Sequence, residues 1–370
     1  MSQLPASTRT AATSRIDAGI ARTTSEDTEE ASQAHGAERE RTMERWIGVI
    51  VGCVCRILAA GAMTLIGLAA KADTYPSKPI TIIVPFGAGS GTDVVTRIIA
   101  QPLSIALKQT VVIENKPGAN GAIAATQVAR AAPDGYTLLM STNSPHSAAP
   151  SLNKTLAYDP VKDFAPLSRV GSYTFIVAVH RDVPATSVAE LIAYAKANPG
   201  KLSYASGNTS GIVAGETLKH KTGIDVLHVP YKTVPTAMND VLAGRVSMIL
   251  TDLTPGLPHV KAGALRALAV TRLKRSALLP DVPSLHEAGV TDFDMDSWAA
   301  LFAPANTPPE IVKRLNAKLR AIIDSPETKA RMAGVGFEGM SSSPEELNDF
   351  VKVQLVKWTK MIKDAGIEQE

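Results

Sequence analysis

The sequence contains little cysteine and little net charge, and each shortage excludes a class of protein. Its two cysteines, Cys53 and Cys55, both lie in an apolar stretch near the N-terminus. The rest of the chain therefore has no disulfide framework and no thiol chemistry. The formal net charge is only +3, so the chain lacks the polybasic surface that nucleic acids require, and we expect no nucleic-acid partner.

Motifs that carry catalysis or hold metals and nucleotides are also missing. The sequence has no Gly-Lys-Ser/Thr phosphate loop, no Gly-x-Ser-x-Gly nucleophile turn and no His-Glu-x-x-His metal pair. Gly87, Gly89 and Gly91 do not complete the dinucleotide fingerprint, because Thr92 stands where its third glycine belongs. Glu114, in the range of a ribose-binding acid, is the one point that favours a nucleotide. We expect no catalytic residue, no metal and no cofactor.

The N-terminal part of the chain has the composition of an export signal. Residues 1–42 are rich in small, polar and charged residues and cannot supply a hydrophobic core. Residues 43–72 combine positive charge, a short apolar run and a small-x-small sequence that ends at Ala72, which is typical of a cleaved secretory signal peptide. We expect cleavage near Ala72 and a periplasmic protein. Translation either starts at Met43, which the pattern favours, or includes residues 1–42 as a true extension.

The remaining residues alternate between strand and helix patterns, which predicts an α/β fold with mixed, mostly parallel sheets. The run Ile80–Val84 is short, apolar and rich in β-branched residues, as expected for a buried parallel strand. Residues 280–307 hold many prolines and show no periodicity, so we expect a connection there. The sequence after residue 308 predicts three helices.

A glycine-rich loop follows that first strand and leads into a helix. Residues 87–91 carry almost no side chains, and Thr92 and Asp93 are residue types that begin helices. The free backbone N–H groups of such a helix N-terminus hold anions, either phosphate or carboxylate. Because the chain is expected outside the cytoplasm, binding is favoured over metabolism.

Three loops of this polar, small-residue character follow the ends of predicted strands. In open α/β sheets ligands lie at the carboxyl ends of the strands. Ordinary tight turns with helix caps explain any one loop, but three in the same register favour ligand binding. The candidate residues in these loops are Phe86, Gly87, Ala88, Gly89, Ser90, Gly91, Thr92, Asp93, Ser141, Thr142, Ser206, Asn208, Thr209 and Ser210.

One further acidic residue follows an apolar strand. Asp252 comes after the run 246–250 and either faces the cleft, where it would accept hydrogen bonds from a ligand amine or hydroxyl, or caps the next helix. The two readings are about equally supported. For Asp93 the same choice favours capping.

Several long motifs resemble one known family. They are YPSKPITIIVPFGAGSGTD, ENKPGANG with APDGYTLL, YDPVKDFAPLSRV, HVPYK and LRALAVTRLKRSALLPDVPSLHEAG. They resemble the Bug family, the extracytoplasmic substrate-binding subunits of tripartite tricarboxylate transporters, over residues 75–367. The resemblance implies a two-domain periplasmic binding fold of type II with a ligand cleft between the domains. It also implies a bound carboxylate held by backbone N–H groups, hydroxyls and water.

The resemblance assigns roles to the candidate residues. Residues 86–93 would hold the carboxylate, Ser141 and Thr142 would add hydroxyls, residues 206–210 would grip from the second domain, and Asp252 would face the far end. Thr233 stands where the family usually has glycine, and we predict that this changes the ligand preference. The loop at 205–211 is also shorter than usual in the family.

The sequence thus predicts a monomeric solute-binding protein that closes on a small carboxylate and delivers it to membrane permease subunits. The expected ligand is a di- or tricarboxylate, an acidic amino acid or an aromatic acid. The expected domains are 73–174 with 297–370, and 175–296, with hinges near Ser172 and Ser297. An exported binder that serves a membrane sensor, or an enzyme acting on a small anion, remain the alternatives.

Overall fold

The structure is a computed structural model that describes Met43 and residues 75–369. The predicted extension 1–42 and, apart from Met43, the predicted signal segment 43–72 fall outside these described residues. Residues 73–370 form one compact unit. Within the described residues, no helix has the length and apolar character needed to cross a membrane.

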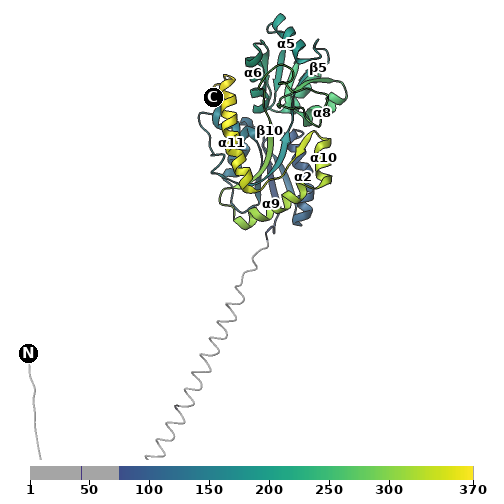
Figure 1. The fold of residues 1–370 in the computed structure, drawn as a ribbon. Coiled ribbons are helices and arrows are strands. Elements are labelled where there is room, and N and C mark those ends of the chain that lie inside the picture. Colours follow the sequence, from purple (N-terminus) through teal and green to yellow (C-terminus); the bar gives the residue numbers. More distant parts are fainter. Residues whose placement is uncertain (1–42, 44–74, 370) are drawn as a thin grey trace, which may run out of the picture. The chain divides into compact units, whose positions relative to one another are not determined.

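Two β-sheets organise this unit (Figure 1). The first has six strands in the order β11-β4-β10-β3-β1-β2. Its strands are β1 (Ile80–Val84), β2 (Val111–Asn115), β3 (Thr137–Thr142), β4 (Phe164–Tyr173), β10 (Ser297–Pro304) and β11 (Phe337–Gly339). The second has five strands in the order β7-β6-β8-β5-β9. Its strands are β5 (Phe175–His180), β6 (Ser203–Ser206), β7 (Leu227–Pro230), β8 (Met248–Asp252) and β9 (Leu265–Val270).

Helices cover both faces of each sheet, and we call each sheet with its helices domain 1 and domain 2. In domain 1 the helices are α2 (Gly91–Leu107), α3 (Ala122–Ala129), α4 (Ala149–Leu152), α9 (Pro309–Ile323), α10 (Pro326–Gly334) and α11 (Pro344–Asp364), with the short turns η1 (Ala119–Gly121) and η2 (Ser144–Ala148). In domain 2 they are α5 (Val188–Ala197), α6 (Thr209–Thr222), α7 (Val234–Leu242) and α8 (Leu253–Lys261). Helices α2 and α9 pack on one face of the first sheet and α3 on the other.

The parallel share of the sheets is smaller than the sequence suggests. Four of the nine described strand pairings are parallel, and the other five are antiparallel. The antiparallel pairings come from strands β4, β5, β9, β10 and β11, which lie at or near the passages between the sheets. The prediction of mixed sheets is confirmed, but the prediction that parallel pairing dominates is wrong.

The segment 280–307 is not simply a connection, because it contains β10. All eight residues of β10 are buried, so the alternation of polar and apolar residues that marks a half-exposed strand is absent. Its partner β4 is interrupted in the sequence by Pro166, which pairs with Phe302, and the β4–β10 register shifts between Leu301 and Phe302 and again between Ala299 and Ala300. Both strands lie in the middle of domain 1.

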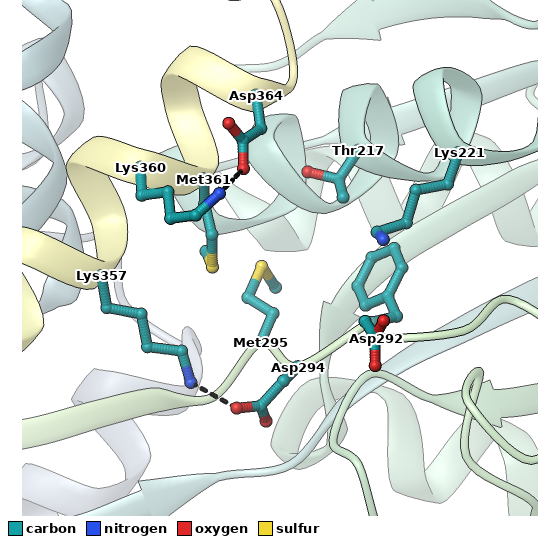
Figure 2. A pocket seen from close by; sticks show the side chains of 10 residues that line it. Thr217, Lys221, Asp292, Asp294, Met295, Lys357, Lys360, Met361 and Asp364 are labelled. Atoms are coloured by element: carbon teal, nitrogen blue, oxygen red, sulfur yellow. Dashed lines mark hydrogen bonds and ion pairs between the residues drawn. The ribbon is translucent and has the colours of Figure 1, made fainter.

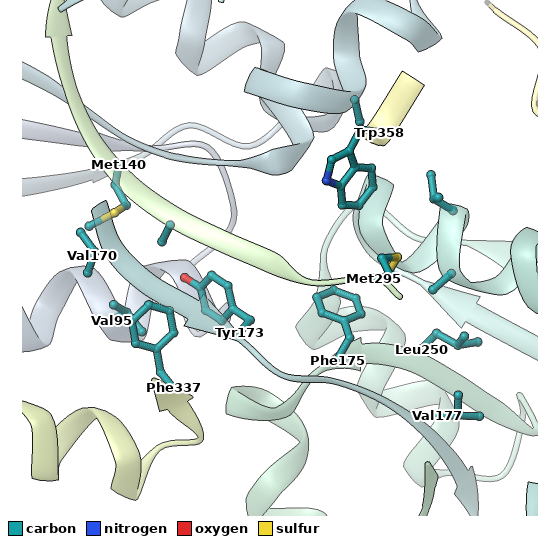
Figure 3. Close-up of a cluster of buried hydrophobic side chains, with 14 of the residues drawn as sticks. Val95, Met140, Val170, Tyr173, Phe175, Val177, Leu250, Met295, Phe337 and Trp358 are labelled. Atoms are coloured by element: carbon teal, nitrogen blue, oxygen red, sulfur yellow. The ribbon is translucent and has the colours of Figure 1, made fainter. Parts of the chain in front are cut away.

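The hydrophobic core runs continuously from one sheet to the other (Figure 3). Strand β4 ends at Tyr173 and β5 begins at Phe175, so Thr174 alone separates the two sheets at this passage. The Tyr173 ring packs edge-on against Phe337 with 4.6 Å between ring centroids. The chain returns to domain 1 just before Ser297. The passage between the domains is therefore buried and well packed.

Candidate functional site

The carboxyl ends of strands from the two domains face each other. In domain 1 the loop after β1 reaches toward α7 of domain 2, and a Cβ atom placed on Gly87 would lie 3.1 Å from Thr233 Cγ2. A cavity of about 540 Å³ lies here, lined by Pro85 and Phe86, by residues 117–121, by Gly207 and by residues 231–233. Its lining comes from both domains, as expected of a ligand cleft.

The glycine-rich loop is held in place by hydrogen bonds within the protein. Ser90 caps α2, and its hydroxyl accepts the Asp93 N–H at 3.3 Å. Asp93 Oδ2 accepts the Gly89 N–H at 2.9 Å, and both carboxylate oxygens contact Arg97 at 3.0 Å. Asn115 donates to Asp93 Oδ1 at 3.1 Å. Asp93 therefore holds the loop and the helix start together from the first turn of α2, while Ser90, and not Asp93, occupies the N-cap position.

The charge of Asp93 follows from these contacts. Burial alone would raise the pKa of Asp93, but hydrogen bonds from Arg97, Gly89 and Asn115 lower it below its ordinary value. The carboxylate therefore stays ionised and contributes to a rigid loop.

Two backbone groups at the start of α2 remain available. Among the described residues, no acceptor pairs with the N–H groups of Gly91 and Thr92, the first two residues of the helix. Helix N-termini leave such groups free, and the helix dipole makes them favourable for an anion. The sequence prediction of an anion-binding helix start is consistent with this geometry.

The second loop uses its polar groups largely within the protein. Ser141 Oγ lies 2.6 Å from His146 Nδ1, and the Thr142 hydroxyl accepts the Ser144 N–H at 3.3 Å. Burial lowers the pKa of His146 to about 3, so its ring is neutral. The hydroxyls of Ser141 and Thr142 already have partners, and a ligand would share them.

Asn143 connects the domains, and the sequence analysis did not select it as a site residue. Its Nδ2 donates to Ser210 Oγ at 2.6 Å, and its Oδ1 accepts a hydrogen bond from Ser297 Oγ. It therefore joins the end of β3 to α6 and to the start of β10. The polar run at residues 141–144 was the available signal, but its partners are far away in the sequence.

The third loop begins α6 and also has internal partners. Ser206 Oγ lies 2.6 Å from His228 Nε2, and Asn208 caps α6 by accepting the Gly211 N–H at 2.9 Å. The Thr209 hydroxyl is buried and has no protein partner. Thr209 and Ser210 therefore lie where the two domains meet, while Ser206 and Asn208 shape the loop.

Domain 2 contributes two further groups. Thr233 caps α7 and faces the glycine loop of domain 1. Lys232 is exposed beside Thr233 and contributes a positive charge to the cavity lining. The sequence analysis did not select residues 117–121 and Gly207, because glycine-rich turns are common outside binding sites.

Asp252 ends β8 at the contact between the domains. It occupies the N-cap position of α8 but makes no capping hydrogen bond, and only 6% of its surface is exposed. Its Oδ1 has no hydrogen-bond partner and lies 2.2 Å from a Cβ position built on Gly91. Burial raises the pKa of Asp252 to about 7, although the nearby backbone N–H groups of Asp252 and Thr254 oppose the rise.

A second cavity of about 330 Å³ lies between α6 and α11 (Figure 2). Its lysines have partners: Lys357 Nζ lies 2.8 Å from Asp294, Lys360 pairs with Asp364, and Lys221 donates to the Thr291 carbonyl at 3.0 Å. With three lysines against three aspartates, this cavity offers an anion no net attraction. In the described part of the chain, no three potential metal ligands gather at one point.

Comparison with known proteins identifies the family. The model of the tripartite tricarboxylate transporter family receptor matches residues 95–367. The chain belongs to this family. It is 33% identical to the protein BugT of Bordetella pertussis over 305 residues, and this match covers 81% of this chain and 94% of BugT.

Solved structures of this receptor family have the same fold. The chain is similar to the periplasmic binding protein BugD, with 37% identity, a TM-score of 0.77 and coverage of 80% of this chain and 100% of that one. It is also similar to an R. palustris protein solved with adipate, with 35% identity, a TM-score of 0.78 and the same coverage. MatC of Rhodopseudomonas palustris, solved with bound malate, shares 29% identity and a TM-score of 0.74 over 78% of this chain and 100% of MatC. This receptor is therefore a solute-binding protein with the two-domain periplasmic binding fold.

Proposed function

We propose that this receptor captures a small carboxylate in the cleft between its two domains. The observation that carries the proposal is the pair of free N–H groups of Gly91 and Thr92 at the start of α2, where Gly91 lies against Asp252 of domain 2. Such groups hold a carboxylate without a dedicated arginine.

The cleft lining agrees with an anionic ligand of modest size. The cavity of about 540 Å³ is in the range of small-molecule sites, and Lys232 supplies positive charge at its domain 2 side. Two similar proteins were solved with adipate and with malate, which are both small dicarboxylates. Thr233 brings a methyl group to the glycine loop, so it would restrict the shape of the bound acid.

We propose that binding occurs by domain closure. Residues 73–174 with 297–370 would form one rigid body and 175–296 the other, with hinges at Thr174 and just before Ser297. A ligand that contacts both domains stabilises the closed form by its differential affinity for that form. The receptor would then present the bound acid to membrane permease subunits after export by the signal at 43–72, and it would act without catalysis.

A calorimetric and thermal-shift screen tests the function. The purified protein is unfolded, dialysed and refolded to remove any retained ligand, and is then mixed with adipate, malate, succinate, citrate, glutamate and benzoate. A ligand present at 100 times its dissociation constant stabilises the folded state by about 2.7 kcal/mol, which raises Tm by several degrees. A saturable shift with one class of acid is expected, whereas a shift with nucleotides or phosphosugars alone would contradict the proposal.

Lys232→Met refines this test. Removing an exposed cation from the cleft is expected to weaken the binding of the preferred acid up to about fivefold, since exposed ion pairs contribute at most about 1 kcal/mol. Lys313→Met, an exposed lysine on α9 far from the cavity lining, is the matched control and should leave the affinity unchanged. Equal losses of affinity in both variants would show that the net charge of the protein, and not a lysine in the cleft, causes the effect.

A further inference from the structure

The start of α2 carries a second feature besides its free N–H groups. The Asp252 carboxyl group from domain 2 lies directly against Gly91, and its Oδ1 has no hydrogen-bond partner although the residue is 94% buried. The Tyr173 ring lies 3.2 Å from the same Cβ position on Gly91, and the Tyr173 hydroxyl also has no partner. An unpaired buried carboxyl group is costly, so it calls for a functional explanation.

No cation neutralises this carboxyl group in the described part of the chain. Asp252 forms no ion pair or hydrogen bond with any described lysine, arginine or histidine. On α2, Asp93 and Arg97 pair with each other. From β4 the titratable neighbour is Tyr173, whose pKa is raised by burial, with Asp252 adding to the rise and Thr92 opposing it. The phenol therefore stays neutral and offers a hydroxyl, not a counter-charge.

A carboxylate bound at the free N–H groups of Gly91 and Thr92 would lie beside Asp252. Two carboxylates in contact within a site closed to water cannot both stay ionised, and one of them keeps a proton. The bound acid accepts hydrogen bonds from the helix start, which favour its ionised form, whereas Asp252 has no such donors at Oδ1. The proton therefore belongs on Asp252.

We propose that Asp252 couples ligand capture to the uptake of one proton: when the domains close on a carboxylate, the protonated Asp252 donates a hydrogen bond to it. This inference rests on the proposed carboxylate-binding function. It assigns Asp252 the role of a donor, in contrast to the acceptor role that the sequence suggested. Because its partner must be an acceptor, Asp252 would select acids that present an oxygen at this end and would disfavour an ammonium group there.

The direction of the pH dependence follows. Without a ligand, burial raises the pKa of Asp252 to about 7, so the carboxyl group loses its proton as the pH rises above neutral; a second carboxylate bound beside it would raise this pKa further and keep the group protonated. The affinity is therefore highest at low pH and falls as the pH rises, by up to about tenfold per pH unit, until the pKa of the closed form is passed.

Isothermal titration tests the proposal at pH 6.5, 7.0, 7.5 and 8.0 with the screened acids apart from citrate, whose third carboxyl group still titrates in this range, whereas the carboxyl groups of the others are ionised. Each titration at pH 7.0 is repeated in PIPES and in imidazole, because their different ionisation enthalpies reveal proton uptake directly. We expect the dissociation constant to rise with pH and the buffers to report uptake of up to one proton. Asp252→Asn should abolish both effects, and Tyr173→Phe should keep both.

The remaining outcomes each decide the question. Binding that is independent of pH and buffer, or an affinity that rises with pH, would overturn the proton-linked role, and the second result would make Asp252 an acceptor from the ligand. If no acid binds to the wild-type protein at any pH, the carboxylate-binding function itself fails, and this inference fails with it. The wild-type buffer comparison decides even if Asp252→Asn does not fold.

Discussion

Asp93 and Asp252 are both buried aspartates at helix starts, but their surroundings differ. Asp93 is 3% exposed and accepts hydrogen bonds from Gly89, Arg97 and Asn115, which lower its pKa. Asp252 is 6% exposed, has an unpaired Oδ1 and has a pKa raised to about 7. Similar burial thus accompanies opposite pKa shifts, and the hydrogen-bond donors around each carboxyl group decide the direction of the shift.

The two aspartates mark two parts of the candidate site, one with its hydrogen bonds satisfied within the protein and one with an unpaired acceptor. In domain 1 the glycine loop is fixed by its own contacts. In domain 2 Asp252 Oδ1 has no hydrogen-bond partner, and in the proposed function the ligand would supply one. Such an arrangement gives the ligand a larger effect on the closed form than on the open form.

The largest expected effect comes from Asp252→Asn in the absence of ligand. A folded-state pKa raised from 3.8 to about 7 costs the wild type nothing below pH 4, an increasing amount between pH 4 and 7, and up to about 4 kcal/mol above pH 7. The variant should therefore be more stable than the wild type at pH 8 by about 2–4 kcal/mol and nearly equal at pH 4. Urea unfolding at both pH values measures this.

Equal stability differences at pH 4 and pH 8 would show that Asp252 is not held neutral in the folded protein. Thr254→Ala, next to Asp252 on α8, is a suitable control because it alters a buried polar group without a titrating one. Its effect should not change between the two pH values.

Asp93→Ala is expected to have the next largest effect, in the opposite direction. It leaves the Gly89 N–H and the Asn115 amide without their acceptor, so the free energy of unfolding at pH 7 should fall by about 2–3 kcal/mol. Because the folded pKa of Asp93 is lowered, its stabilisation is present above pH 4 and is lost as the pH falls further.

The difference between wild type and Asp93→Ala should therefore shrink at pH 2.5, as measured by thermal unfolding in low salt. A constant difference from pH 7 to pH 2.5 would mean that packing and not charge stabilises this loop. Asp93→Asn keeps the volume of the side chain, so its free energy of unfolding should lie between those of the wild type and Asp93→Ala.

Arg97→Met is expected to have the smallest effect. The Arg97 side chain is 54% exposed, so its two contacts with Asp93 contribute about 0.5 kcal/mol at moderate salt. Chemical denaturation at 50 mM and 500 mM NaCl should show the loss shrinking at high salt. A loss above 2 kcal/mol would mean that Arg97, and not the Gly89 N–H and the Asn115 amide, keeps Asp93 ionised.

The sequence predicts those parts of the fold whose local pattern matches their environment. Strand β1 was found because its short apolar run is rich in β-branched residues, and the C-terminal helices because their apolar residues recur at the helical period. Strand β10 was missed because its sequence SWAALFAP has no β-branched residue and lies in a proline-rich segment. Strand β4 was missed because Pro166 and Gly171 interrupt its pattern, although β10 and β11 supply its pairing.

The candidate site shows the same division. Loop composition predicted a helix start with free N–H groups, because such groups depend only on local structure, whereas anion binding there stays a prediction. Composition did not reveal that Ser141 pairs with His146 or Ser206 with His228, nor that Asn143 spans to Ser210. These contacts depend on how distant segments pack. The pKa values of Asp93 and Asp252 shift in different directions for the same reason.

The place of β10 in the first sheet has a consequence for biosynthesis. Strand β10 lies between β3 and β4, yet the ribosome makes it after every strand of domain 2. The five-stranded sheet can therefore assemble from an emerging chain while the six-stranded sheet still lacks its centre and leaves edges of β3 and β4 unpaired. Until residues 297–304 emerge, those edges are the part of the chain most exposed to mispairing and to capture by chaperones.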